Sequence, residues 1–219
     1  MTRPRLLTFD IFGTVVDWRR GLTEALARAG RPLEEGEFDA VVDRQGALEQ
    51  EHPFRNYREI TRLSLIDVLG LDAAAADAIG ETVGQWPAYG DAPEALRRLM
   101  AIAPCVAMTN SDRAHGVQAQ GALGFLLSAW ICAEDVRCYK PSPAFWSDVS
   151  RRLGIEPGPA WWHVSAYADY DLAVARGLGL TTVFVDRPHA RPGPADHRVA
   201  NLGELADLVG GLVTGAVEA

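Results

Sequence analysis

Several polar side chains follow apolar stretches of the sequence, at positions from which they could converge on one chemical site. Asp10 comes directly after the apolar run LLTF, and Thr109 and Asn110 end the run CVAMTN. Ser165 ends WWHVS, and Lys140 follows a weaker apolar run within RCYKPSP. One acid, one amine, hydroxyls and an amide form a set suited to catalysis, because an ionised carboxylate can act as a nucleophile and a nearby amine lowers its pKa.

The elements that would position these side chains alternate along the chain. Apolar, strand-like runs cover residues 5–12, 105–110, 161–167 and 181–186, with a weaker run at 129–136. Helix-like segments cover residues 91–101, 113–124, 143–154 and 169–179. This alternation predicts an α/β fold, a doubly wound (Rossmann-like) parallel sheet covered by helices on both faces. Ligands of such sheets bind at the carboxyl ends of the strands, where we expect the polar residues to meet.

Residues 18–86 interrupt this alternation and contain no convincing strand. They indicate helices near 19–30, 34–51, 56–70 and 72–86, separated by AGRP, EHPF and GLD. We therefore expect a core of residues 1–15 and 91–219 with an inserted helical cap of residues 16–90. The cap would leave the core just after the first strand and could cover the site. Residues 187–198 look like an irregular loop, and GELADLV after them like a last helix.

Composition restricts the partners and the compartment. The 219 residues carry a net charge of -8 and a pI of about 5.1, which argues against nucleic acid and anionic membrane as partners. Cys105, Cys132 and Cys138 have no paired spacing, so neither a disulfide framework nor a zinc site is indicated. No apolar run approaches the ~18 residues of a membrane span, and we expect a cytoplasmic enzyme. The sequence leaves the oligomeric state open, a homodimer included.

Four stretches together resemble the motifs of a known family. FDIFGTVVD, MTNSD, YKPSP and HVSAYADYDLAVARGLGLTTVFV are similar to the four motifs of the haloacid dehalogenase superfamily, in order and at typical spacing. The resemblance covers nearly the whole chain, helical insert included. GTVVDW, QWPAYGDAPEAL, TNSDR and CYKPSPAFW most resemble the hydrolytic 2-haloacid dehalogenase (type II) branch. They are equally similar to its relatives that open the ring of azetidine-2-carboxylate.

The resemblance implies catalytic roles for the residues near the strand ends. Asp10 would be the nucleophile that attacks an sp3 carbon and forms an ester, which water then hydrolyses. Lys140 would keep Asp10 ionised and oriented, and the hydroxyls of Thr14 and Thr109 would fix the attacking oxygen. The simpler alternatives are that Asp10 only caps the following turn and that Lys140 is a surface lysine.

The resemblance also indicates where a small carboxylate substrate would bind. Its carboxylate would lie near Thr109, Asn110 and the backbone amides after Asp10, because exposed N–H groups favour anions. Trp146 stands where dehalogenases typically have a tyrosine, so the bulk is kept and the hydroxyl is lost. The substrate-binding positions implied in this way are Ile11, Phe12, Thr109, Asn110, Trp146, Ser165 and Tyr167.

Two departures from the phosphatases of the superfamily predict that no metal or other cofactor is required. Those enzymes carry an acid two residues after the nucleophile, where this chain has Phe12, an apolar wall that would strip water from the carboxylate. They also hold magnesium with an aspartate in the fourth motif, where this chain has Ser165 and Ala166. Asp10 and Asp171 beside Lys140 would make a poor magnesium site.

Two further residues are assigned by resemblance, each with a simpler alternative. Arg44 matches the dehalogenase segment whose arginine accepts the departing halide, and it shares a helical stripe with Val41 and Leu48. It could instead be a surface arginine paired with a nearby glutamate. Asp171 matches the fourth-motif acid and would hold Lys140 or position the hydrolytic water, or it could only cap a helix.

The residues and the resemblance lead to one expected function with three alternatives. We expect a hydrolase that displaces halide from C2 of a small 2-substituted carboxylic acid through an aspartyl ester. The first alternative is ring opening of a strained cyclic amino acid such as azetidine-2-carboxylate, which would require an acid near the cap because the leaving amine needs a proton. The others are a magnesium-dependent phosphatase and a non-catalytic binding relative.

Overall fold

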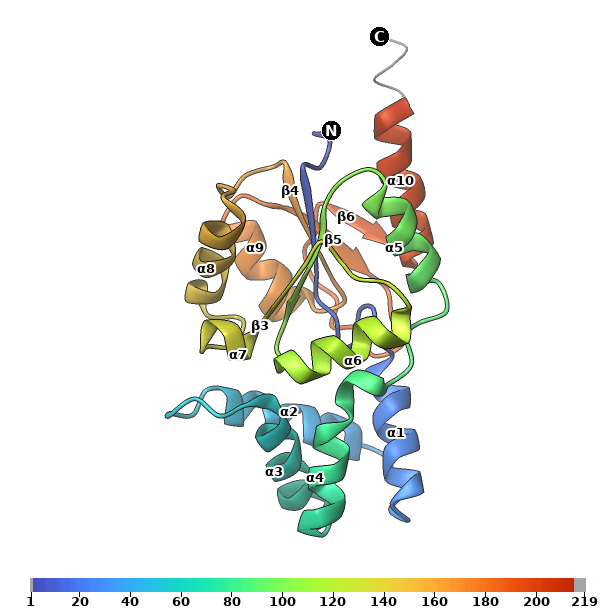
Figure 1. The fold of residues 1–219 in the computed structure, drawn as a ribbon, viewed down its shortest axis with the longest axis vertical. Coiled ribbons are helices and arrows are strands. Elements are labelled where there is room, and N and C mark those ends of the chain that lie inside the picture. Colours follow the sequence, from blue (N-terminus) through green and yellow to red (C-terminus); the bar gives the residue numbers. More distant parts are fainter. Residues whose placement is uncertain (1, 215–219) are drawn as a thin grey trace.

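A six-stranded parallel sheet forms the centre of the computed structural model, which describes residues 2–214 (Figure 1). Its spatial order is β3-β2-β1-β4-β5-β6, and the order reverses between β1 and β4. The strands are β1 (Leu6–Phe9), β2 (Cys105–Thr109), β3 (Ala129–Cys132), β4 (Trp161–Ser165), β5 (Thr181–Val185) and β6 (His197–Val199). β1, β2 and β4 are buried along their whole length, as strands covered on both faces must be. The predicted doubly wound α/β fold is confirmed.

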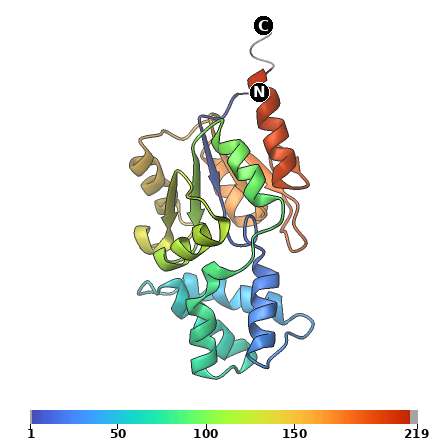
Figure 2. The ribbon, with the colours of Figure 1, turned by 45° about the vertical axis from the view of Figure 1, so that its right-hand side comes forward.

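Helices cover both faces of the sheet (Figure 2). One face carries α5 (Ala92–Met100), α6 (Arg113–Leu123) and α10 (Leu202–Thr214), and the other carries α8 (Pro143–Leu153) and α9 (Ala173–Gly177). α5 shows why these segments are helical, since Ala92, Ala95, Leu96 and Leu99 form one buried stripe at helical spacing. None of the helices within residues 2–214 is long and apolar enough to cross a membrane.

Three local details differ from the sequence-based expectation. The strand expected at 129–136 ends at Cys132, and a short helix, α7 (Ala133–Val136), follows it. β6 lies inside and just beyond the expected loop of residues 187–198 as a three-residue edge strand. The helix expected at 169–179 begins with a π-helical turn, η2 (Ala168–Leu172), whose Asp171 points inward while Asp169 is exposed.

The helices inserted after β1 form a separate layer at the carboxyl ends of the strands (Figure 1). They are α1 (Trp18–Arg28), α2 (Glu37–Glu49), α3 (Tyr57–Leu69) and α4 (Ala73–Glu81), followed by a 3-10 turn, η1 (Val83–Gln85). The two connections to the core run side by side, because the Asp17 amide donates to the Pro87 carbonyl at 2.8 Å and the Tyr89 amide to the Val15 carbonyl at 3.0 Å. The insert therefore leaves and re-enters the core at one place.

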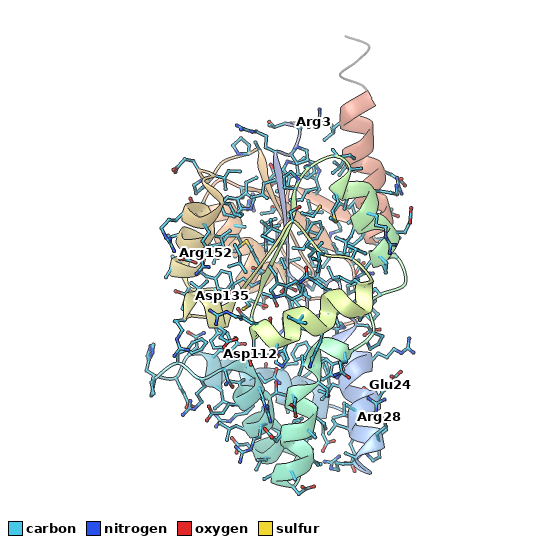
Figure 3. All side chains as sticks on the ribbon, in the orientation of Figure 1. Arg3, Glu24, Arg28, Asp112, Asp135 and Arg152 are labelled. Atoms are coloured by element: carbon cyan, nitrogen blue, oxygen red, sulfur yellow. The ribbon has the colours of Figure 1, made fainter. Side chains whose placement is uncertain are left out.

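Asp112 joins the inserted layer to the core (Figure 3). It precedes α6, and its two carboxylate oxygens accept hydrogen bonds from the Tyr57 amide at 2.7 Å and the Arg58 amide at 2.9 Å. A carboxylate at the N-terminus of α3 satisfies free amides and complements the helix dipole. This buried contact fixes α3, and with it the neighbouring α2, over the strand ends.

Candidate active site

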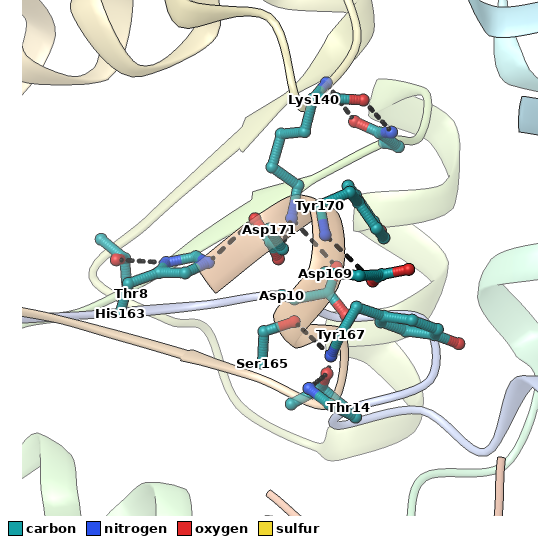
Figure 4. A network of polar contacts seen from close by, with 12 residues as sticks. Thr8, Asp10, Thr14, Lys140, His163, Ser165, Tyr167, Asp169, Tyr170 and Asp171 are labelled. Atoms are coloured by element: carbon teal, nitrogen blue, oxygen red, sulfur yellow. Dashed lines mark hydrogen bonds and ion pairs between the residues drawn. The ribbon is translucent and has the colours of Figure 1, made fainter. Parts of the chain in front are cut away.

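Three buried charges meet below the inserted helices (Figure 4). The Lys140 ammonium donates to Asp10 Oδ1 at 3.1 Å and to Asp171 Oδ2 at 2.8 Å. The side chains of Lys140 and Asp171 are fully buried, and that of Asp10 is 5% exposed. Asp10 lies at the carboxyl end of β1, where its amide donates to the Val164 carbonyl and so continues the β1–β4 pairing.

Asn110 holds the backbone of Lys140 in place. Its side-chain carbonyl accepts from the Lys140 amide at 2.8 Å, and its Nδ2 donates to the Lys140 carbonyl at 3.1 Å. Nδ2 also donates to Glu49 Oε2 at 3.0 Å. Both hydrogens of the Asn110 amide group are therefore used within the protein.

The loop after β1 clamps the second oxygen of Asp10. Thr14 Oγ1 donates to Asp10 Oδ2 at 2.8 Å and accepts from the Ala166 amide at 2.9 Å. The turn between them requires glycine, since Gly13 has a φ of +102° and a Cβ there would lie 2.4 Å from the hydroxyl oxygen of Tyr167. Two oriented donors thus hold the two oxygens of Asp10, one from Thr14 and one from Lys140.

Burial and the neighbouring charges set the ionisation of these groups. Burial would lower the pKa of Lys140, but Asp10 and Asp171 outweigh it and raise this pKa above its usual value. Burial would raise the pKa of Asp171, but Lys140 and His163 hold it far below the usual range. Burial is also the main cause that raises the pKa of Asp10, with Asp171 adding to it and Lys140 and Thr14 opposing it. Lys140 is thus a cation and Asp171 an anion, while Asp10 is a carboxyl group with a raised pKa and little water around it.

A buried histidine extends this network into the core. His163 Nε2 lies 3.2 Å from Asp171 Oδ1, and its Nδ1 lies 2.8 Å from Thr8 Oγ1. Thr8 Oγ1 also accepts from Trp161 Nε1 at 2.8 Å. His163 is fully buried, so it supports Asp171 from behind and has no access to a substrate.

A cavity of about 290 Å³ opens above Asp10, between the strand ends and α2. Thr109 Oγ1 and the Tyr167 hydroxyl are buried there, and neither has a hydrogen-bond partner within the described residues. The core contributes Asp10, Phe12, Thr109, Asn110, Lys140, Pro141, Tyr167, Asp169, Tyr170 and Arg191 to its lining. The inserted helices and their connections contribute Trp18, Val42, Asp43, Gln45, Gly46, Glu49, Gln50 and Tyr57.

The structure divides the site residues expected from the sequence into two groups. Asp10, Phe12, Thr109, Asn110, Lys140 and Tyr167 line the cavity. Ile11, Thr14, Trp146, Ser165 and Asp171 are buried and do not line it. Trp146 packs edge-on against His163 with ring centroids 4.7 Å apart, and Ser165 Oγ accepts from the Tyr167 amide. The buried residues outside the lining therefore position the residues that line the cavity.

Arg44 differs from its expected position. It lies on α2, but its guanidinium pairs with Asp67 Oδ2 at 2.7 Å and Glu51 Oε1 at 3.5 Å, on the outer side of the inserted helices. The residues of α2 that face the cavity include Val42, Gly46 and Glu49, a stripe at helical spacing that is rotated from Arg44. Arg44 thus pairs with a glutamate at the surface, as the simpler alternative expected. It does not lie above Asp10, where the resemblance placed it.

Glu49 and Arg191 are cavity residues that the sequence analysis missed. Burial is the main cause that raises the pKa of Glu49 to about 8, with Asp10 adding to it and Asn110 and Lys140 opposing it. Arg191 comes from the segment expected to be an irregular loop, and its guanidinium lies 3.2 Å from Asp43 Oδ1 and 3.7 Å from Asp169 Oδ2. The spacing of Val42, Gly46 and Glu49 is a signal that could have pointed to Glu49.

The donor set near Asp10 does not fit a magnesium ion. Within residues 2–214 no group of three or more His, Cys, Asp or Glu side chains is arranged to hold a metal. The Lys140 ammonium lies between Asp10 and Asp171, 3.1 Å from Asp10 Oδ1 and 2.8 Å from Asp171 Oδ2. A cation at that place would meet a fixed positive charge instead of a third oxygen ligand.

Comparisons with known proteins show which proteins the chain is similar to. A family model described as haloacid dehalogenase-like hydrolase matches residues 4–162. The (S)-2-haloacid dehalogenase 4A of Burkholderia cepacia is 26% identical, and the match covers 97% of each chain. The crystal structure of the L-2-haloacid dehalogenase PA0810 is 26% identical with a TM-score of 0.80, covering 94% of this chain and 99% of its own. The Xanthobacter autotrophicus L-2-haloacid dehalogenase with covalently bound chloropropionic acid shares the fold, at 19% identity and a TM-score of 0.80, over 95% of this chain and 99% of its own.

Proposed function

The chain belongs to the haloacid dehalogenase-like hydrolases, and from this premise we propose that it displaces halide from C2 of a small 2-substituted carboxylic acid through a covalent aspartyl ester. The observation that carries the proposal is Asp10 in the lining of the cavity, held by Thr14 and paired with the buried Lys140. The match to an (S)-2-haloacid dehalogenase over 97% of both chains supports this substrate class.

The geometry supports a reaction in two steps. In the first, a carboxylate oxygen of Asp10 bonds to C2 while the bond from C2 to the halide breaks, and the halide leaves with the electron pair. In the second, water adds to the carbonyl carbon of the ester, which releases the 2-hydroxy acid, a proton and the Asp10 carboxylate. Phe12 at the cavity wall is 7% exposed and limits the water around the nucleophile before attack.

The substrate carboxylate is best placed against donors that the protein leaves unused. Thr109 and Tyr167 line the cavity, and their buried hydroxyls have no partner within the described residues. An unpaired buried hydroxyl costs free energy, which a bound carboxylate would recover by accepting a hydrogen bond. Asn110 is a weaker candidate than the sequence suggested, because both of its amide hydrogens are already used.

We also propose that the enzyme needs no metal or other cofactor. The poor fit of Asp10, Asp171 and Lys140 to magnesium supports catalysis without a metal or other cofactor. The inserted helices would act as a cap, because they form one wall of the cavity. The free cysteines Cys105, Cys132 and Cys138 support a reducing compartment such as the cytoplasm.

Isotope labelling tests the covalent step. In a single turnover with 2-chloropropionate in heavy-oxygen water, label should enter the Asp10 carboxylate, and label entering the product directly would contradict the ester. Asp10→Asn should release no halide while keeping its fold, and Asp207→Asn, on exposed α10, should release it at the parent rate. A chelator should leave the rate unchanged. A rate that collapses with chelator and returns with magnesium would favour the phosphatase alternative.

A second candidate function is ring opening of a strained cyclic amino acid of the azetidine-2-carboxylate type. It is favoured by one observation, the acid Glu49 on α2 facing the cavity. The leaving amine of such a ring has to carry a proton, and a carboxyl group on the inserted helices could supply or hold it. Formation of a ring-opened hydroxy amino acid without halide release would distinguish this function.

A further inference from the structure

The cavity lining contains the acid Glu49, and within the described residues it contains no unpaired cation that could receive a leaving halide. The two cations that line it are Lys140 and Arg191, and both are already paired. Lys140 is held by Asp10 and Asp171, while Arg191 lies between Asp43 and Asp169. Halide that develops charge here has no uncommitted guanidinium to receive it within the described residues.

Glu49 on α2 lines the same cavity as Asp10. Its Oε2 accepts the Asn110 hydrogen bond, which ties the carboxyl group to the same side chain that holds the Lys140 backbone. Burial raises the pKa of Glu49 to about 8, which allows its carboxyl group to hold a proton near neutral pH. With Oε2 accepting, the proton of the neutral acid is carried by Oε1.

We propose that Glu49 is the acid that donates to the leaving atom while Asp10 forms the ester, as a proton to nitrogen and as a hydrogen bond to fluoride. The site therefore suits substrates whose leaving atom accepts a proton or a strong hydrogen bond as it departs, namely the nitrogen of a strained ring or fluorine, at C2 of a small carboxylic acid. This inference rests on the aspartyl ester of the proposed function. It makes Glu49 the residue that decides which leaving groups the enzyme favours.

The step balances in atoms and charge. An oxygen of Asp10 bonds to C2, and the electron pair of the breaking bond goes to the leaving atom. A ring nitrogen is basic enough to take the proton of Glu49, which is left as a carboxylate, and one proton of the water that hydrolyses the ester then returns to Glu49. Fluoride is a weaker base than the Glu49 carboxylate, so it leaves as the anion with a hydrogen bond from Glu49, which keeps its proton, and the proton of the hydrolytic water goes to solvent.

Leaving groups differ in how much they gain from such a proton. Fluoride and amine nitrogen are strong hydrogen-bond acceptors, whereas chloride and bromide leave readily as weakly basic anions. A positioned general acid contributes roughly 10²–10⁴ in rate where proton transfer is part of the transition state. Glu49 should therefore matter greatly for carbon–fluorine or ring carbon–nitrogen cleavage and little for carbon–chlorine cleavage.

Glu49 is a cavity group whose pKa is raised to about 8. Asp10 and Lys140 are the charged groups that act on this pKa, and Glu49 in turn helps to raise the pKa of Tyr57, Tyr139 and Tyr170. Burial raises the pKa of each of the three phenols, and the carboxylates around Lys140 raise its pKa, so all four keep their charge state there. Arg191, which also lines the cavity, lies 3.2 Å from Asp43 Oδ1 and 3.7 Å from Asp169 Oδ2.

The test compares leaving groups in variants of one residue. The parent enzyme, Glu49→Ala and Glu49→Gln would each receive 2-fluoropropionate, 2-chloropropionate and azetidine-2-carboxylate, with kcat/KM followed against pH. Glu49→Ala should lose ~100-fold or more on the fluorinated or cyclic substrate and change little on the chlorinated one. Glu49→Gln should keep part of the activity through an N–H donor and lose the fall in rate above pH 8. Glu51→Gln, an exposed acid two residues away, should behave as the parent.

The outcomes separate this inference from the function on which it rests. Equal losses on fluorinated and chlorinated substrates, or an unchanged alkaline fall in Glu49→Gln, would overturn the role of Glu49 while labelled Asp10 still supported the ester. A parent enzyme that acts on none of the three substrates would overturn both. Fluoride release against ring-opened product decides which leaving atom the site serves.

Discussion

The Lys140 ammonium lies 2.8 Å from Asp171 Oδ2 with both side chains fully buried, so the two residues form an ion pair beneath the cavity. Asp171 receives a second contact from His163 on its other oxygen. It therefore fixes Lys140 from the core side while Lys140 reaches Asp10 on the cavity side. Removing one partner from a buried pair leaves the other charge uncompensated. Loss of Lys140 and loss of Asp171 should therefore change the pKa of Asp10 in opposite directions.

Lys140→Met and Asp171→Asn should shift the acidic limb of the pH profile for the rate of ester formation in opposite directions. The charge of Lys140 lowers the pKa of Asp10, so its loss should move the limb to higher pH, by about 1 to 3 units. The charge of Asp171 raises that pKa, so its loss should move the limb to lower pH. Both variants should form the ester more slowly at the plateau, because the donor to Asp10 is absent in Lys140→Met and is no longer held by Asp171 in Asp171→Asn. Rapid-quench measurement against pH checks this, and shifts of the same sign would contradict the arrangement.

Arg44→Ala should form the aspartyl ester at close to the parent rate. The guanidinium contacts Asp67 and Glu51 on the outer side of α2, away from the cavity lining. A partly exposed pair of this kind contributes roughly 0–1 kcal/mol to the free energy of unfolding, so a small loss of stability is expected. Rapid quench for the ester and urea unfolding for stability measure the two effects. A hundredfold slower ester formation would show that Arg44 turns into the cavity when substrate binds.

The difference between Arg44 and Glu49 shows what the sequence could predict and what it could not. The alternating apolar runs predicted the parallel sheet, because buried strands such as β2 and β4 have to be apolar along their whole length. Which side of α2 faces the strand ends depends on a rotation of about 100° per residue. Val41 and Leu48 are buried on one side, while Val42 and Gly46 line the cavity on another, so the pattern fits both orientations.

Other parts of the site depend on local geometry that composition does not reveal. Asp169 and Asp171 are two residues apart, and the π-helical turn η2 sends one to the surface and the other to Lys140. The edge strand β6 has three residues and a single buried one, Val199, which gives no apolar run to detect. Arg191 precedes it in a segment rich in proline, and its place in the cavity follows from tertiary contacts alone.

Gly13 is the position where the nucleophile loop has least freedom. Its φ of +102° strains any other residue, and a Cβ would lie 2.4 Å from the hydroxyl oxygen and 2.7 Å from the nearest ring carbon of Tyr167. Tyr167 lines the cavity, and Thr14 directly after Gly13 holds Asp10. A side chain here must therefore move the cavity wall, the clamp on Asp10, or both.

Gly13→Ala should lower both stability and activity, and Gly30→Ala provides the matched control. Gly30 also has a positive φ, +74°, but a Cβ there meets nothing within 4 Å. The control should lose about 1 kcal/mol from backbone strain and keep its kcat. Gly13→Ala should lose a further ~1–3 kcal/mol from the forced contact with Tyr167, and its ester formation should slow because Asp10 is no longer held by Thr14 in the same geometry. Thermal unfolding and rapid quench measure both quantities. If the two variants were equally stable and equally active, Tyr167 would have room to move aside, and the tight packing of the nucleophile loop would not matter for catalysis.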